Sequence, residues 1–217
     1  MMLKNRLARY FVRIPTIETE RLILRRILPK DCENMYDYSK REEVTRYLLW
    51  IPHESREYTR RYIDALQTQY RSGQFYDWAL ELKENGRMIG TCGFAVIDEK
   101  NNSAEVGYVL APDYWGFGYA PEALREILRV GFETLGFNRI EARYMTGNEK
   151  SRRVMEKCGM KFEGIRREAL YVKDSYRSIG YCSMLKDEFF SLYGRHEVKN
   201  EPKPHWYDAF VGGVNKK

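Results

Sequence analysis

Hydrophobic and polar residues recur along this chain with two different periods. Apolar residues at every second position predict β-strands, and such runs cover residues 19–27, 75–82, 87–97, 103–110, 139–145, 161–171 and 175–185. Apolar residues with a period near 3.6 predict amphipathic helices, and these cover residues 31–44, 55–72, 121–135 and 151–158. The order β-α-α-β-β-β-α-β-α-β-β predicts an α/β (α+β) protein with a mixed central sheet and helices on its faces.

Turn residues separate these runs at the expected places. Asn85-Gly86 lies between two strand patterns and is a strong hairpin signal. Lys173-Asp174 occupies the equivalent place between the last two strands, and Gly73 ends the second helix. The sequence therefore predicts two hairpins and compact connections, with no internal repeat.

Composition places the chain among globular proteins. The 217 residues are 43% hydrophobic and 31% charged, with a mean hydropathy of −0.63, which excludes disordered, collagen-like and membrane-embedded classes. No apolar run is long enough to span a bilayer, and the start lacks the features of a secretory signal, although its arginines leave a mitochondrial presequence weakly open. The scattered four cysteines and three histidines predict no metal site and reduced thiols in the cytosol.

Charge is distributed unevenly along the sequence. The formal net charge is +6, and residues 1–30 carry a net +6, residues 31–149 a net −6 and residues 150–173 a net +5. A basic balance raises the hypothesis of an RNA-binding or ribosome-binding protein, but no RNA-recognition signature accompanies it. Nucleic acid is therefore not expected as a partner.

The stretch from residue 111 to residue 128 carries the clearest chemistry. A strand pattern runs into a loop with Gly116 and Gly118, and a helix follows directly. Backbone N–H groups at such a helix N-terminus form an anion site, and glycines let phosphate oxygens approach closely. The alternative is an ordinary glycine-rich turn, because the loop is neither a Walker A motif nor a complete dinucleotide fingerprint.

This loop resembles the acetyl-CoA pyrophosphate loop of the GNAT N-acetyltransferase superfamily. It reads WGFGYA over residues 115–120 and is followed by Glu122-Ala123, as in the ribosomal-protein N-terminal (RimJ/RimL-like) branch. Further matches follow in the family's order: ETERLILR near the start, GxxGF at residues 90–94, AEVGYVL before the loop and NEKSRRVMEKCGMKFEG after it. Trp115 departs from the Arg or Gln that is general in the superfamily.

The resemblance implies a fold and a domain plan. It covers residues 16–187 and implies the acyl-CoA N-acyltransferase fold, with a mostly antiparallel sheet. Residues 1–15 are then expected to be a basic leader and residues 188–217 a C-terminal tail. It also implies direct transfer of an acetyl group from acetyl-CoA to an amine in a ternary complex in the cytoplasm, without a metal.

The resemblance further implies which residues bind the co-substrate. The strand before the loop is expected to leave a neighbouring strand and free its backbone for pantetheine and the thioester. The expected acetyl-CoA contacts are Tyr108, Val109, Leu110, Trp115, Gly116, Phe117, Gly118, Tyr119, Ala120, Asn148, Ser151 and Arg153. Asn148 and Ser151 have an alternative role as helix caps, and the basic residues after them have an alternative role as a solvated helix face.

Two residues are the expected catalytic pair. The resemblance makes Glu105 the general base, although an ion pair across the sheet explains a strand glutamate equally well. Ser151 is the expected general acid, because Met155 stands where many members have a tyrosine and cannot donate a proton. Tyr144 and Tyr171 are the fallback donors.

The acceptor is the least determined part of the prediction. Residues 31–72 should form one wall of its site, together with an aromatic and acidic set, namely Trp50, Tyr76, Asp77, Trp78 and Phe94. Packing in the core explains the aromatic residues as well. A protein N-terminal α-amine, in particular on a ribosomal protein, is the first expectation and a small-molecule amine the second. A catalytically idle CoA-binding sensor is the alternative outside enzymes, and a homodimer is left open.

Overall fold

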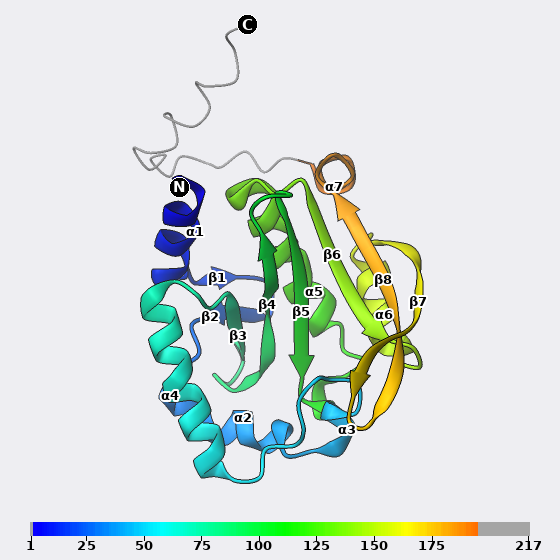
Figure 1. Ribbon diagram of the computed structural model, residues 1–217. Helices are drawn as coiled ribbons and strands as arrows, with labels where there is room; N and C mark the ends of the chain where they lie inside the picture. Colours follow the sequence, from blue (N-terminus) through cyan, green and yellow to red (C-terminus); the bar gives the residue numbers. More distant parts are fainter. Residues whose placement is uncertain (1, 195–217) are drawn as a thin grey trace, which may run out of the picture.

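The computed structural model describes residues 2–194, with side chains from Leu7 onward, and contains one eight-stranded sheet in the order β1-β2-β3-β4-β5-β6-β8-β7 (Figure 1). The strands are β1 (Ile17–Glu18), β2 (Leu22–Arg25), β3 (Asp77–Leu82), β4 (Met88–Asp98), β5 (Ser103–Leu110), β6 (Arg139–Met145), β7 (Lys161–Val172) and β8 (Ser175–Leu185). All pairings are antiparallel except β5 with β6. The predicted mixed, mostly antiparallel sheet is confirmed.

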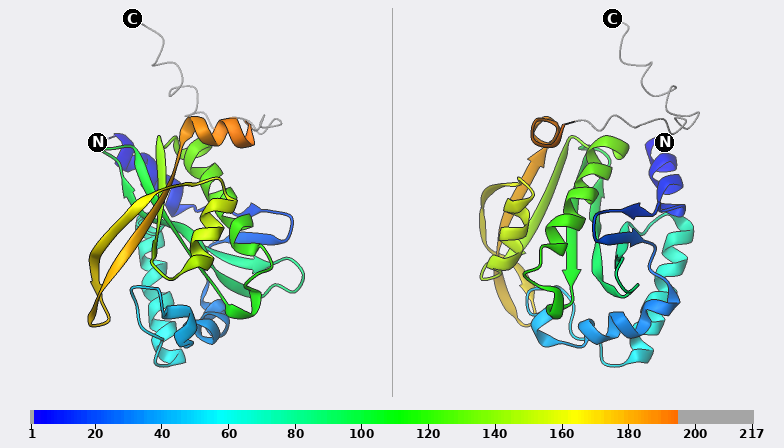
Figure 2. Two further views of the ribbon diagram at one scale, coloured as in Figure 1. Left: turned by 90° about the vertical axis from the view of Figure 1, so that its right-hand side faces the viewer. Right: turned by 180° about the vertical axis from the view of Figure 1, so that it is seen from behind.

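Helices cover both faces of this sheet. They are α1 (Met2–Val12), α2 (Cys32–Ser39), α3 (Glu42–Thr45), α4 (Arg56–Ser72), α5 (Tyr119–Arg129), α6 (Glu149–Lys157) and α7 (Lys186–Tyr193). Figure 2 shows α1 and α4 on one face and α5 and α6 on the other. The apolar side of α5 is fully buried at Ala123, Leu124, Ile127 and Leu128, so the period of 3.6 in its sequence corresponds to a helix packed on the sheet.

Three expected elements differ in detail. The strand expected over residues 19–27 is a short hairpin, because Thr19 N–H donates to the Leu22 carbonyl at 2.9 Å and turns the chain between β1 and β2. The helix expected over 31–44 is interrupted at Arg41, whose backbone is extended. The helix expected over 121–135 continues from α5 as a π-helical turn over residues 130–135.

The N-terminal segment is part of the folded structure. Residues 2–12 of the segment that the charge pattern sets apart as a basic leader form α1. Phe11 is fully buried, and its ring packs edge-to-face on Tyr76, Trp78 and Phe94. Trp78 and Phe94 are therefore core residues and offer no surface to an acceptor, as the packing alternative required. The tail expected over residues 188–217 begins inside α7, and its part from residue 195 lies outside the described residues.

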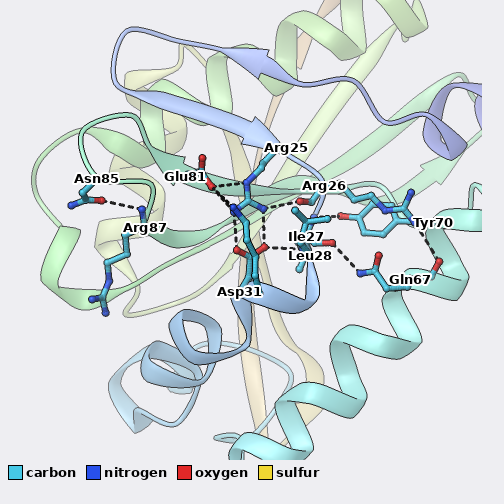
Figure 3. A network of polar contacts seen from close by, with 11 residues as sticks. Arg25, Arg26, Ile27, Leu28, Asp31, Gln67, Tyr70, Glu81, Asn85 and Arg87 are labelled. Atoms are coloured by element: carbon cyan, nitrogen blue, oxygen red, sulfur yellow. Dashed lines mark hydrogen bonds and ion pairs between the residues drawn. The ribbon is translucent and has the colours of Figure 1, made fainter.

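A buried charge cluster fastens β2 to β3 and to the chain before α2 (Figure 3). The Arg25 guanidinium donates two hydrogen bonds to the Asp31 carboxylate, both at 2.7 Å, and a third to Glu81 at 2.7 Å. Asp31 also accepts from the Leu28 N–H at 2.8 Å. The side chains of Arg25 and Asp31 are only 11% and 3% exposed, so each charge depends on the other for the solvation that water would otherwise supply.

Candidate functional site

The central feature of the site is the point where β5 and β6 separate. Their parallel pairing runs from Ser103 and Arg139 to Val106 and Ala142. Beyond these residues β5 continues to Leu110 on β4, while β6 continues to Met145 on β8. Figure 1 shows the two strands diverging, so the last residues of β5 have a free edge that no strand covers. This is the separation that the family resemblance implied for Tyr108, Val109 and Leu110.

A cleft with a volume of 980 Å³ lies at this separation. Its walls come from the end of β5, the loop before α5, the end of β6, the start of α6 and the segment from α3 to Leu49. The hairpin of β7 and β8 closes it on one side, because the Lys173 ammonium group donates to the Thr45 carbonyl at 2.6 Å. Asp77 of β3 and Thr91 and Ala95 of β4 also line it, so segments that are distant in the sequence surround one hollow.

The glycine loop borders this cleft at the start of α5. Gly116 and Gly118 have φ values of +88° and +86°, which side chains with a Cβ rarely adopt. Gly118 is the N-cap of α5, and the first N–H groups of a helix have no acceptor within it. No heavy atom lies within 4 Å of a Cβ placed on Gly116, so the backbone is accessible. The loop fits a bound pyrophosphate by both its donors and its dipole.

A polar clamp from the turn between β1 and β2 holds this loop. Glu122, in the first turn of α5, accepts from the Thr19 hydroxyl at 2.6 Å and from the Arg21 N–H at 2.9 Å. The Arg21 side chain forms an ion pair with Glu122 at 2.6 Å, donates to the Phe117 carbonyl at 2.9 Å and stacks on the Tyr119 ring. Both motifs resemble those of the family, but their contact in the folded protein was not predicted.

Trp115 has a structural contact that its place in the motif did not reveal. Its indole N–H donates to the Leu110 carbonyl at 2.8 Å and thereby joins the end of β5 to the loop. The Lys150 ammonium group lies 4.3 Å from the centre of the indole ring. Trp115 and Lys150 both line the cleft, so this position orders the loop and places a cation beside it.

The Ser151 hydroxyl at the start of α6 lies beside the Tyr108 hydroxyl of β5. Asn148 caps the helix by accepting from the Ser151 N–H at 3.2 Å, which is the structural role considered for it. The Tyr108 hydroxyl lies 2.8 Å from the Ser151 carbonyl and 2.9 Å from the Ser151 hydroxyl. Burial raises the pKa of Tyr108, so its phenol keeps its proton. The sequence placed Tyr108 here for its backbone, and no spacing pattern pointed to its hydroxyl.

The remaining donors that the sequence considered are separated by the fold. Met155, which stands where many members of the family have a tyrosine, is buried. Tyr144 lines the cleft, whereas Tyr171 is 61% exposed and lies outside it. Of the expected proton donors, Ser151 lines the cleft beside the Tyr108 hydroxyl. Tyr144 is the fallback proton donor that also lines the cleft.

The basic residues of α6 divide into two groups. Arg152 forms ion pairs with Glu156 at 2.8 Å and with Glu149 at 3.9 Å along its own helix. Arg153 and Lys157 lie one turn apart and line the cleft. Among the described residues neither of these two forms an ion pair, so their charges are available to an anionic ligand.

Glu105 lies on β5 with its carboxylate in the cleft. It forms an ion pair with Arg143 of β6 at 2.8 Å, and its side chain is 14% exposed. Removal from water raises the pKa of Glu105, while Arg143 lowers it and Glu141 raises it, with a net rise. The cross-strand ion pair that the sequence analysis considered is present, and the carboxylate nevertheless faces the cleft.

Three further observations concern metal-ligating groups, membrane-spanning helices and cysteines among the described residues. Residues 2–194 contain no group of three or more histidine, cysteine or acidic side chains placed to hold a metal ion, and no helix there is long and apolar enough to cross a membrane. The four cysteines are buried, and burial raises the pKa of Cys92, Cys158 and Cys182. None of these three thiols is prepared for nucleophilic attack.

Comparison with known proteins agrees with this geometry. Residues 21–161 match the family described as "Acetyltransferase (GNAT) domain". The chain is 36% identical over 172 residues to "Uncharacterized N-acetyltransferase YoaA" of Bacillus subtilis, covering 79% of this chain and 97% of that protein. It is 29% identical over 180 residues to "Putative ribosomal N-acetyltransferase YdaF" of the same organism, covering 78% and 94%. The crystal structure of a GNAT-family acetyltransferase from Bacillus anthracis superposes with a TM-score of 0.72 at 27% identity, covering 80% and 100%.

Proposed function

The chain belongs to the GNAT acetyltransferases, and from this premise we propose that it transfers an acetyl group from acetyl-CoA to a primary amine, in particular a protein N-terminal α-amine. The observation that carries the proposal is the cleft where β5 leaves β6, bordered by the loop of Gly116 and Gly118. The cleft joins an anion-binding helix terminus to an uncovered strand edge. These are the parts that a phosphorylated thioester co-substrate needs.

Each predicted residue has a place in this reaction. Backbone groups of residues 108–110 and 116–120 would hold pantetheine and pyrophosphate, with Asn148 and Ser151 beside them. Arg153 would meet a phosphate group, because its charge has no ion-pair partner among the described residues. Acetyl-CoA brings the thioester, whose bond to sulfur must break as the bond from the amine nitrogen to the carbonyl carbon forms.

The proton balance assigns two side chains. The attacking amine gives up a proton, and Glu105 receives it, directly or through water. The departing CoA thiolate takes a proton from the Ser151 hydroxyl, which regains one from water, while the Tyr108 hydroxyl, 2.9 Å away, keeps its proton and orients the serine. A covalent acetyl-enzyme is not part of the proposal, since the neighbouring cysteines are buried and protonated.

The acceptor assignment draws support from the name of YdaF, which is 29% identical. A screen of CoA release with N-terminal peptides and with small amines tests it. Turnover with peptides above that with amines supports the N-terminal assignment, and the reverse order assigns a small amine. Tight CoA binding without turnover on any amine would indicate a CoA sensor.

Ser151→Ala separates the chemical step from binding. We expect kcat to fall about 10-fold while the dissociation constant of CoA, measured by calorimetry, stays nearly unchanged. An effect confined to CoA binding would make Ser151 a ligand contact instead of an acid.

A further inference from the structure

Gly93 and Gly107, on neighbouring strands, leave a strip of the sheet without side chains beside the reaction site. We call this strip the glycine floor. Gly93 of β4 is the register partner of Asp77 on β3 and of Gly107 on β5, and directly opposed residues point to the same face of a sheet. A Cβ on Gly93 would lie 2.4 Å from Oδ1 of Asp77. The Asp77 side chain therefore extends over Gly93 toward Gly107, where a Cβ would meet only the Ala95 methyl at 3.9 Å.

The Asp77 carboxylate lacks the cation that its counterparts have. The partly buried carboxylates Asp31, Glu81, Glu105 and Glu122 each form an ion pair with an arginine at 2.6–2.8 Å. Among the described residues Asp77 forms none, and the Thr91 hydroxyl is its hydrogen-bond donor. Burial accordingly raises the pKa of Asp77 to about 7.

The groups that face Asp77 are neutral near pH 7. They are the phenols of Tyr38 on α2 and of Tyr62 and Tyr70 on α4, and the thiol of Cys92 on β4. Burial raises the pKa of each of these four groups, and that of Tyr62 reaches about 12. His53, whose ring lies 5.7 Å from that of Tyr62, has its pKa lowered by burial. None of these neighbouring groups, and no ion pair among residues 2–194, thus supplies a positive charge to this carboxylate.

Asp77 and Glu105 line the same cleft, with Ala95 and Gly107 between them. Acetyl transfer needs one proton acceptor, and Glu105 already has Arg143 as its counter-charge. We propose that Asp77 binds a second positive group of the acceptor, so that the preferred acceptors carry an ammonium group in addition to the amine that reacts. This inference rests on the proposed function and names the chemistry of its acceptor.

The spacing of the strands sets the length of such an acceptor. Asp77 and the edge of β5 are two strands apart, or about 10 Å between their backbones, and the aspartate side chain spans part of this distance. The remaining gap corresponds to roughly four or five methylene groups between the two nitrogens. A free diamine and a peptide with an N-terminal lysine share this chemistry.

The experiment compares acceptors that differ in one charge. It measures kcat/KM for 1,4-diaminobutane relative to butylamine, and for a peptide with N-terminal lysine relative to one with N-terminal norleucine. We expect the dicationic member of at least one pair to be preferred, and the pair that shows the preference identifies the source. Asp77→Asn should lower that preference about 10-fold, whereas Asp187→Asn, an exposed charge removal on α7, should leave it unchanged.

Several outcomes would overturn the inference. A wild-type enzyme without preference in either pair, or an Asp77→Asn enzyme that keeps the preference, contradicts it while leaving acetyl transfer intact. If Asp77→Asn does not fold, the wild-type preference between pH 6 and 8 decides: it should rise with pH as Asp77 ionises near 7, and a flat profile rules out the carboxylate. Absence of turnover on any amine overturns the proposed function. In that case the thermal shift with CoA present tests Asp77 alone, and it must be larger for 1,4-diaminobutane than for butylamine.

Discussion

Strand β3 carries two partly buried carboxylates near its ends, and the fold treats them in opposite ways. Glu81, toward one end, joins Arg25 and Asp31 in a cluster where each charge has a partner within 2.7 Å. Asp77, at the other end, faces the cleft without an ion pair among the described residues. A paired cluster holds strands together but binds nothing further. An unpaired carboxylate costs stability when it ionises, and its charge remains available to a ligand.

The largest effect is expected on the paired side. Asp31→Ala leaves the Arg25 guanidinium buried beside a single remaining acid, so we expect the free energy of unfolding to fall by about 3–5 kcal/mol. Denaturant titration followed by circular dichroism measures it. Glu33→Ala is the control, because its ion pair with Arg56 is exposed and is worth about 0–1 kcal/mol. Equal losses in both variants would contradict the role of the cluster.

Glu105 combines both situations, since it is paired and also faces the cleft. Glu105→Gln should lower kcat about 100-fold and leave CoA affinity nearly intact. Only the ionised carboxylate accepts a proton. Burial raises the pKa of Glu105 by more than the charge of Arg143 lowers it. Activity should therefore fall as the pH drops through this raised pKa, at a higher pH than for an exposed glutamate. Stopped-time CoA release across pH measures both effects, and wild-type-like turnover of the variant would refute the base assignment.

The paired Glu122 tests whether a structural ion pair can serve binding indirectly. Glu122→Gln weakens the clamp from Thr19 and Arg21 on the loop of Gly118, so we expect CoA affinity to fall about 10-fold with a smaller change in kcat. Calorimetry with CoA provides the measurement. Glu126→Gln removes a carboxylate from the same helix that pairs with Arg129 instead. A similar loss of affinity in this control would show that the charge of α5, not the clamp, is responsible.

The smallest effect is expected on stability at Asp77 and has the opposite sign. Burial raises the pKa of Asp77 in the folded state to about 7, well above the ordinary value of an aspartate, so the folded state disfavours the ionised form. The stabilising contribution of the protonated carboxyl is present below about pH 4 and is lost as the pH rises to 7. Asp77→Asn should thus raise the free energy of unfolding at pH 8, and raise it by less at pH 5. Denaturation at both values tests it, and destabilisation at pH 8 would contradict an unpaired charge.

Much of the architecture could be predicted from periodicity. The strands at residues 103–110 and 139–145 were predicted with the bounds that they have, and the hairpin at Asn85-Gly86 is confirmed between β3 and β4. The helix α1 was missed because the arginines between its apolar residues disguise its buried side, which Phe11 reveals. The split of α2 from α3 was also missed, since a single extended residue, Arg41, leaves the apolar period almost unchanged.

The site divides in the same way. From its residues alone, the loop of Gly116 and Gly118 could be either an anion-binding turn or an ordinary glycine-rich turn, although positive backbone angles and free N–H groups are local properties of glycine before a helix. The resemblance to the family motifs then made a CoA site the expectation for this loop. The side-chain contacts of Ser151 and Glu122 could not be predicted, since their partners Tyr108 and Arg21 lie 43 and 101 residues away.

By itself, therefore, the sequence determined most of the elements, their order and the glycine loop before a helix, because these depend on periodicity and backbone freedom over a few neighbouring residues. Only the tertiary structure decided which charges are neutralised. Asp77 and Glu81 stand four residues apart in one strand, and nothing local distinguishes them. Arg25 lies close to Glu81, whereas the glycine floor lies beside Asp77. Whether a carboxylate meets a cation on folding depends on contacts between strands that are distant in the sequence.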